Sequence, residues 1–250
     1  MPYHILKSSY CTDHEWKGRS DCAHCSIRGM MLFSQLPPES FAHLLQPIDN
    51  ETYPPNSILY GEGRPGRLVF SIRRGLVKLL SQDSEGNERI VRLVGKGAVI
   101  GLELLDKGVS YRHTAVAVQN VDLCAIPLAT LKDLEEHHPA LCDRIRQQLQ
   151  YQIDRADQWI KHLNTGKARV RIAELLLLLT EISGDKNGDV ELLPRDDMAA
   201  VVGITKETAS RIIAEFKRHR LLYKVAAGLY RVEVQRLREL IAHEARPGAD

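Results

Sequence analysis

The sequence is poor in three features, and each shortage limits what the protein can be. No hydrophobic run among its 250 residues approaches the roughly 18 that a membrane-spanning helix needs, so no membrane partner is expected. The opening residues MPYHILKSSY lack the long apolar stretch of a secretory signal, which favours a cytoplasmic protein. The net charge is only +2, so a surface that binds nucleic acid has to be a local concentration of Lys and Arg.

Catalytic patterns are also lacking. No serine–histidine–aspartate grouping, phosphate-binding loop or pair of carboxylates stands out along the chain. We therefore do not expect an enzyme, and proteins that act by binding other molecules are the favoured class.

Cysteine is scarce, but its distribution is uneven. Three of the five cysteines lie in the stretch CTDHEWKGRSDCAHC, residues 11–25, which neither repeats like a helix nor alternates like a strand. In a cytoplasmic protein such thiols are expected to bind a metal or to undergo redox chemistry rather than to form disulfides. Cys22 and Cys25 have the C-x-x-C spacing, which zinc sites, iron–sulfur sites and metal-free redox thiols share. A zinc site would add Cys11 and a histidine of this stretch.

Residues 57–126 are predicted to form short strands. Four runs in this region are β-branched and roughly alternating, and glycines separate them. This pattern is typical of a small all-β barrel or double-sheet roll. The preceding segment PPESFAHLL predicts a short helix that begins at proline.

From Pro139 onward, apolar residues recur at spacings of three and four, which predicts one long amphipathic helix. The apolar stripe is narrow, as in a coiled-coil seam, so we predict a dimerisation helix. The alternative is a helix that packs only on its own domain. The residues predicted to contact a second subunit are Ile145, Leu149, Ile153 and Ile160.

Residues 194–222 predict two helices joined by a tight turn. Gly203 supplies the turn, and Thr205 is a natural N-cap for the second helix. The exposed side of that second helix is predicted to meet base edges in the major groove and, at its basic end, phosphates. The predicted DNA-contacting residues are Lys206, Glu207, Ser210, Arg211, Lys217 and Arg218. A hairpin through Gly228 follows, typical of the wing in a winged helix. The alternatives are an ordinary helical hairpin with a charged face, or a protein that does not touch DNA.

Together these segments resemble the Crp/Fnr family of bacterial transcription regulators, and the resemblance covers nearly the whole chain. It implies an α+β fold and a homodimer that binds double-stranded DNA and contacts RNA polymerase. The implied domains are a cysteine-rich sensory segment (1–30), a β-roll (31–136), a dimerisation helix (137–164) and a winged helix-turn-helix (165–250). In the Fnr-like branch the pattern E-T-x-S-R, present here from Glu207 to Arg211, goes with TTGAT-type half-sites in an inverted repeat. The chemistry agrees, because Glu accepts from cytosine and Arg binds guanine.

The resemblance also implies that the β-roll could hold a cyclic nucleotide. That requires a Gly-Glu pair for the ribose and an Arg-Ser pair for the phosphate. Here Gly101 precedes a leucine, Glu103 lies one place late, and Tyr111-Arg112-His113 stands where Arg-Ser is expected. We therefore do not expect a cyclic nucleotide as cofactor.

Fnr-type oxygen sensors, which this chain resembles, hold a [4Fe–4S] cluster with an N-terminal cysteine group and one distant cysteine. Cys22 and Cys25 match two N-terminal ligands, and Cys124 matches the distant one. The third N-terminal cysteine is expected near Met31, and a thioether cannot supply a thiolate's charge. The predicted ligand set is Cys11, Cys22, Cys25 and Cys124. Cys142 is interpreted as structural, and zinc is the alternative cofactor.

Overall fold

The computed structural model describes residues 20–22, 25, 27–82, 84–85, 88–106, 108–185 and 187–244. The chain divides into two compact units, Met1–Gln152 and Ile153–Asp250. Cys11 lies outside the described residues. Within the described ranges, no helix is both long enough and apolar enough to cross a membrane.

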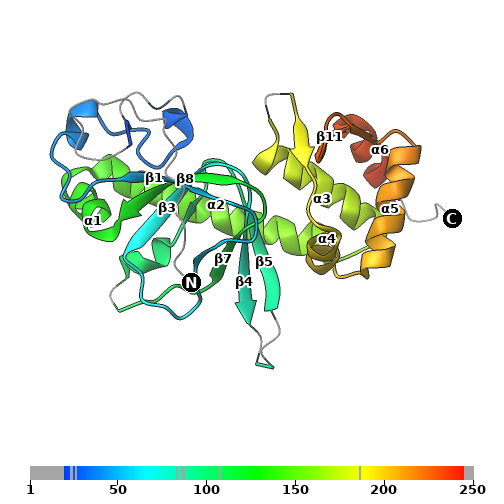
Figure 1. The fold of residues 1–250 in the computed structure, drawn as a ribbon, viewed down its shortest axis with the longest axis horizontal. Coiled ribbons are helices and arrows are strands. Elements are labelled where there is room, and N and C mark those ends of the chain that lie inside the picture. The colour runs from blue at the N-terminus through cyan, green and yellow to red at the C-terminus, as the bar shows by residue number, and fades with distance from the viewer. Residues whose placement is uncertain are drawn as a thin grey trace. The chain divides into compact units, whose positions relative to one another are not determined.

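The first unit is built on two four-stranded antiparallel sheets (Figure 1). One sheet has the order β1-β8-β3-β6, formed by Asp49–Tyr53, Val121–Pro127, Leu68–Arg74 and Val99–Ile100. The other has the order β2-β7-β4-β5, formed by Ile58–Tyr60, Thr114–Ala117, Val77–Gln82 and Glu88–Val94. Alternate residues of both sheets, such as Phe70, Leu79 and Leu123, form a shared core. The predicted double-sheet roll is confirmed.

Short helical turns, one helix and the first part of a second helix complete the first unit. The turns are η1 (Arg28–Met30), η2 (Pro38–Phe41) and η3 (Leu102–Leu105), and the helices are α1 (Leu128–His137) and α2 (Pro139–Leu163). The residues of α2 from Ile153 onward belong to the second unit. The short helix expected in PPESFAHLL is only the single 3₁₀ turn η2. A second core cluster joins the segment around Leu32 to strand β8, to α1 and to the first turns of α2.

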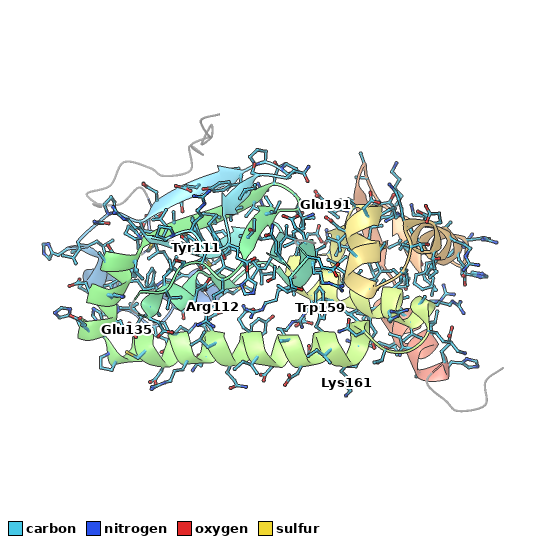
Figure 2. All side chains as sticks on the ribbon, turned by 90° about the horizontal axis from the view of Figure 1, so that it is seen from below. Tyr111, Arg112, Glu135, Trp159, Lys161 and Glu191 are labelled. Atoms are coloured by element: carbon cyan, nitrogen blue, oxygen red, sulfur yellow. The ribbon has the colours of Figure 1, made fainter. Side chains whose placement is uncertain are left out.

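The apolar residues of α2 divide into two groups, which corrects one prediction. Leu141 and Ile145 are 1% and 4% exposed and belong to the second core cluster. Leu149, Ile153 and Ile160 are 46%, 55% and 61% exposed. Because an α-helix has about 3.6 residues per turn, residues spaced by four shift gradually around it. The expected single stripe on α2, which Figure 2 shows along its length, is therefore two neighbouring faces. Ile145 is therefore covered by its own domain rather than free for a second subunit.

The second unit contains four further helices and a three-stranded sheet among its described residues (Figure 1). The helices are α3 (Ala168–Ser183), α4 (Arg195–Val202), α5 (Lys206–Arg218) and α6 (Val234–Glu244). The sheet has the order β10-β11-β9, formed by Leu222–Lys224, Leu229–Val232 and Asp189–Glu191. Gly228, with φ of +76°, makes the β10–β11 turn, a conformation that glycine adopts without strain. The predicted winged helix-turn-helix is confirmed.

Candidate functional site

Helices α4 and α5 form the helix-turn-helix of the second unit. Gly203 ends α4 in the left-handed conformation, with φ of +66°, and its N–H bonds the carbonyl of Ala199. The hydroxyl of Thr205 accepts a hydrogen bond from the N–H of Thr208 at 3.2 Å. The predicted turn glycine and N-cap are therefore present, and together they fix where α5 begins.

The surface of α5 is sharply divided. Its buried side consists of Ala209, Ile212, Ile213 and Phe216. The six predicted DNA-contacting residues, Lys206, Glu207, Ser210, Arg211, Lys217 and Arg218, are all exposed. The N-terminal half thus offers a carboxylate, a hydroxyl and a guanidinium, whereas the C-terminal end offers cations. Such a face can bond base edges and phosphates.

Both lysines of this set have partners within the unit. Lys206 Nζ lies 2.9 Å from a carboxylate oxygen of Asp196, and both side chains are more than half exposed. Exposed ion pairs of this kind are weak, so Lys206 can exchange Asp196 for a phosphate. Lys217 donates to the hydroxyl of Tyr230 on β11 at 3.0 Å and lies 4.4 Å from its ring centroid. The lysine lowers the pKa of Tyr230, chiefly through this hydrogen bond.

Tyr230 was not among the residues identified from sequence. It connects α5, the recognition helix, to the β10–β11 hairpin, and only its position two residues after Gly228 could have indicated a role.

An arginine of α3 forms ion pairs with α5 and with α6. Arg169 lies 2.9 Å from Glu215 on α5 and 2.9 Å from Glu244 on α6. Arg171, also on α3, donates to the carbonyl of Val202 at the end of α4. These contacts fix α4 and α5 to the same helix, α3.

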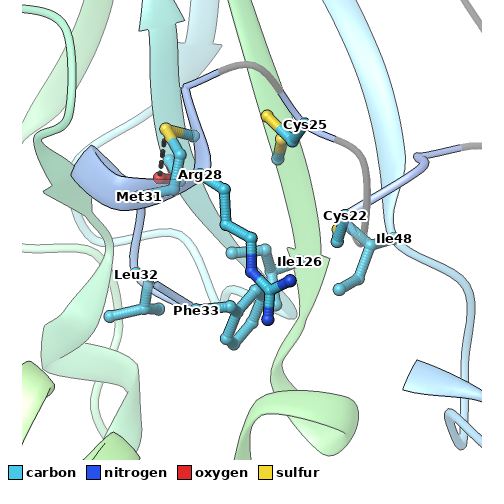
Figure 3. A pocket seen from close by; sticks show the side chains of 10 residues that line it. Cys22, Cys25, Arg28, Met31, Leu32, Phe33, Ile48 and Ile126 are labelled. Atoms are coloured by element: carbon cyan, nitrogen blue, oxygen red, sulfur yellow. Dashed lines mark hydrogen bonds between the residues drawn. The ribbon is translucent and has the colours of Figure 1, made fainter. Parts of the chain in front are cut away.

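A pocket in the first unit is lined by two neighbouring cysteines of the N-terminal segment and by a third that is distant in the sequence (Figure 3). Cys22 and Cys25 reach it from the N-terminal segment, and Cys124 reaches it from β8. The remaining lining residues are Arg28, Met31, Leu32, Phe33, Ile48, Ser71 and Ile126. Three of the four predicted ligands are thus brought together, whereas Cys11 lies outside the described residues.

Strand β1 attaches the N-terminal segment beside Cys124. Asn50 pairs with Cys124 across the β1–β8 ladder, and its side-chain oxygen accepts from the Cys124 thiol at 3.4 Å. The same oxygen accepts from the hydroxyl of Ser20 at 2.9 Å, while the N–H of Ser20 bonds the carbonyl of Ile48 at 3.1 Å. Asn50 therefore links both cysteine-bearing segments.

The environment of Cys22 favours a neutral thiol in the metal-free protein. Burial, then the neighbouring Cys124 and Cys25, raises the pKa of Cys22 well above its usual range. Binding of a metal would displace the thiol proton. Three cysteines that line one pocket supply the donor type of a thiolate-bound cofactor. Among the described residues, however, no group of three His, Cys, Asp or Glu is arranged to hold a metal ion.

Met31 lines the same pocket, at the position where the resemblance leads one to expect a cysteine. It is 6% exposed, and its sulfur accepts a long hydrogen bond of 3.9 Å from the hydroxyl of Ser71 (Figure 3). A thioether carries no charge, so Met31 supplies apolar lining and not a thiolate.

Tyrosines fill part of the interior of the β-roll. Tyr111, labelled in Figure 2, is 6% exposed and stacks on Tyr60 with 3.9 Å between ring centroids. Its hydroxyl donates to the carbonyl of Leu68 at 2.7 Å, and burial raises its pKa to about 12. A Cβ at Gly66 would lie 2.5 Å from the Tyr111 ring, so the missing side chain makes room for this tyrosine. Glu103 accepts from the N–H of Arg112 at 3.2 Å.

Comparisons with known proteins cover both units. Residues 50–138 match the cyclic nucleotide-binding domain family, and residues 170–242 match the Crp-like helix-turn-helix domain family. The chain is 30% identical over 187 residues to the transcriptional regulator SdrP of Thermus thermophilus, covering 73% of this chain and 89% of that protein. It is 28% identical over 188 residues to the cyclic AMP receptor protein of the same organism, covering 75% and 85%. The structure of FixK2 from Bradyrhizobium japonicum aligns with a TM-score of 0.68 at 22% identity, covering 80% and 99%, and shows the same fold.

Proposed function

This chain belongs to the Crp/Fnr family of DNA-binding transcription regulators, and from that premise we propose that it is a homodimer whose DNA binding responds to oxygen or redox state. The cysteine pocket senses the signal, α2 joins the subunits, and α5 reads the DNA. One observation carries the sensory part of this proposal: Cys124, on β8, lines the same pocket as Cys22 and Cys25.

The proposed DNA site is a TTGAT-like inverted repeat. Glu207 and Arg211 read base edges in each half-site together with Ser210, while Lys206, Lys217 and Arg218 contact phosphates. This assignment is supported by the exposure of all six side chains on a helix whose opposite side is fully buried. Carboxylate and guanidinium groups can distinguish one base from another by hydrogen bonds to its edge. Contacts with phosphates strengthen binding but carry no sequence information. Contact with RNA polymerase is part of the same proposal.

The proposed subunit contact is the exposed face of α2. Leu149, Ile153 and Ile160 are large apolar side chains with about half of their surface exposed or more. Their spacings of four and seven keep them on one side of the helix, so the same helix of a second copy can cover them.

The proposed cofactor is a [4Fe–4S] cluster held by Cys22, Cys25 and Cys124, with Cys11 as the fourth thiolate. Such a cluster supplies a centre that oxygen destroys. The chain's own contribution is to bring the thiols together in a mostly apolar pocket and to hold the N-terminal segment on β1 through Asn50. We do not propose a cyclic nucleotide, because Tyr111 fills part of the roll interior and the backbone of Arg112 engages Glu103.

Metal analysis of anaerobically purified protein tests this function. We expect about four iron and about four sulfide per chain, with visible absorbance that air removes. Stoichiometric zinc without sulfide would instead assign the thiols to a zinc site. Protein with neither metal nor sulfide, whose DNA affinity still falls on oxidation and recovers with a thiol reductant, would assign them to metal-free redox sensing.

A further inference from the structure

The cysteine pocket is connected to α2 by hydrogen bonds that run through the turn η1. The turn begins at Arg28, whose N–H donates to the carbonyl of Cys25 at 3.0 Å. The turn ends at Met30, whose carbonyl accepts from the guanidinium of Arg144 on α2 at 3.2 Å. The position of this carbonyl therefore depends on where the cysteine segment lies.

A turn of the β-roll at Gly97 also lies next to the Met30 carbonyl and contacts α2. Gly97 has φ of +83°, and a Cβ at this position would lie 3.2 Å from the carbonyl oxygen of Met30. The carbonyl of Gly97 accepts from the side-chain amide of Gln148 on α2 at 3.3 Å. Arg144 and Gln148 are four residues apart, so one side of α2 holds both the cysteine segment and the adjoining turn of the roll.

The buried side of α2 is incompletely hydrogen-bonded. Gln148 and Gln152 are 7% and 9% exposed. In the described part of the chain, the side-chain oxygen of Gln148 and the side-chain nitrogen of Gln152 have no hydrogen-bond partner. Buried amides without partners are unfavourable, so this side of α2 is held less firmly than a fully hydrogen-bonded one.

The same helix carries the exposed apolar face. Leu149 directly follows Gln148, and Ile153 directly follows Gln152. Because a helix moves as a rigid rod over a few turns, a shift at Arg144 and Gln148 also moves these exposed side chains.

We propose that Arg144 is the residue that couples the state of the cysteine pocket to the orientation of α2, with Gln148 as a second positioning residue. This inference rests on the proposed function. Cys25 would hold a bound cluster, and η1 then ties the Met30 carbonyl, to which Arg144 donates, to the position of Cys25. Without a bound cluster the turn would not be held at Cys25, the Arg144 contact would weaken, and α2 could take another packing. Coupling of this kind requires that the contact differ between the two states.

The test compares full-length Arg144→Ala with Arg146→Ala. Arg146 lies on the same helix, but its side chain is 72% exposed and pairs with Asp143, one turn away on α2. Cluster content is measured from iron, sulfide and absorbance, and DNA affinity is measured with the cluster and again after air exposure. In the wild type we expect air to change DNA affinity by about 5- to 150-fold, the usual range of coupling between sites.

Arg144→Ala is expected to keep its cluster while the change in DNA affinity on air exposure falls below about threefold, whereas Arg146→Ala keeps the wild-type change. Arg144→Lys, which retains one donor and the charge, should recover part of the change. A purely structural role would alter stability or cluster content without altering this ratio. A second variant, Gln148→Met, retains the side-chain volume and removes only the bond to Gly97, so it tests the coupling if Arg144→Ala does not fold.

Two outcomes separate this inference from the proposed function. A wild type that responds to air, with Arg144→Ala and Gln148→Met responding to the same extent, overturns the coupling role alone. A wild type without iron and sulfide overturns the proposed cluster and the coupling role with it.

Discussion

The recognition motif and the cysteine pocket are built in opposite ways. The helix-turn-helix consists of contiguous residues. It has its own N-cap, α5 has a fully buried side, and Arg169 of α3 forms ion pairs with α5 and α6. The pocket is assembled largely from the N-terminal segment and strand β8. It is linked through η1 to α2, where two buried amides have no hydrogen-bond partner among the described residues. A helix that recognises DNA has to keep its side chains in fixed positions, whereas a sensor needs two packings of similar free energy. We therefore expect α5 to be rigid and the packing around α2 to change.

The largest effect is expected from removing the long-range member of the pocket. Cys124→Ser should abolish the anaerobic iron–sulfur absorbance and the associated DNA binding together, because a hydroxyl does not replace a thiolate ligand. Cys142→Ser is the matched control, since Cys142 contacts Glu135 rather than the pocket. A Cys124→Ser protein with a full cluster would separate β8 from the sensor.

The fourth ligand can be tested by moving it. Cys11→Ser should lose the cluster, and Met31→Cys in the same chain should restore it, because residue 31 already lines the pocket beside the three described cysteines. Iron and sulfide content measures both steps. Full cluster content in Cys11→Ser alone would exclude Cys11 as a ligand.

A charge on the exposed face of α2 should dissociate the dimer. Ile153→Glu would place a carboxylate in an apolar contact, where burial of an unpaired charge costs several kcal/mol. Analytical ultracentrifugation at micromolar concentration should show monomers, whereas Gln147→Glu, at another exposed position of α2, should leave dimers. A wild type that is monomeric with and without air and DNA would remove this face from the account.

Base reading by α5 should show as lost specificity. Arg211→Ala is expected to weaken binding by about 1–3 kcal/mol per half-site and to relax the preference for a TTGAT-type palindrome. Affinities for that palindrome and for scrambled DNA, at one salt concentration, provide the measurement. Unchanged affinity and selectivity would contradict the proposed docking of α5.

The smallest effect is expected at the basic end of α5. Lys217→Ala should weaken binding to all sequences alike and lower the salt slope by about one. Tyr230→Phe removes the hydroxyl that Lys217 contacts but leaves the charge of Lys217 in place, so the salt slope should not change. A sequence-dependent loss in Lys217→Ala would mean that this lysine reads bases.

Sequence alone was sufficient where structure is set by neighbouring residues. The turn at Gly203, the cap at Thr205 and the alternating strands follow from local conformational preferences and were predicted. Ile145 was assigned to the exposed face because periodicity does not distinguish two adjacent faces of one helix. The contact of Arg144 was not predicted, because its partner is a backbone carbonyl that leaves no pattern in the sequence.

The central claim is that a cluster in the cysteine pocket controls DNA binding, and one time course tests it most directly. A single anaerobic sample of wild-type protein is exposed to air while its visible absorbance and its affinity for a TTGAT-type palindrome are followed together. We expect both to decay with the same half-time, and we expect Arg144→Ala to lose its absorbance at the wild-type rate while its DNA affinity hardly changes. Absorbance that disappears while wild-type DNA affinity stays constant would contradict the central claim.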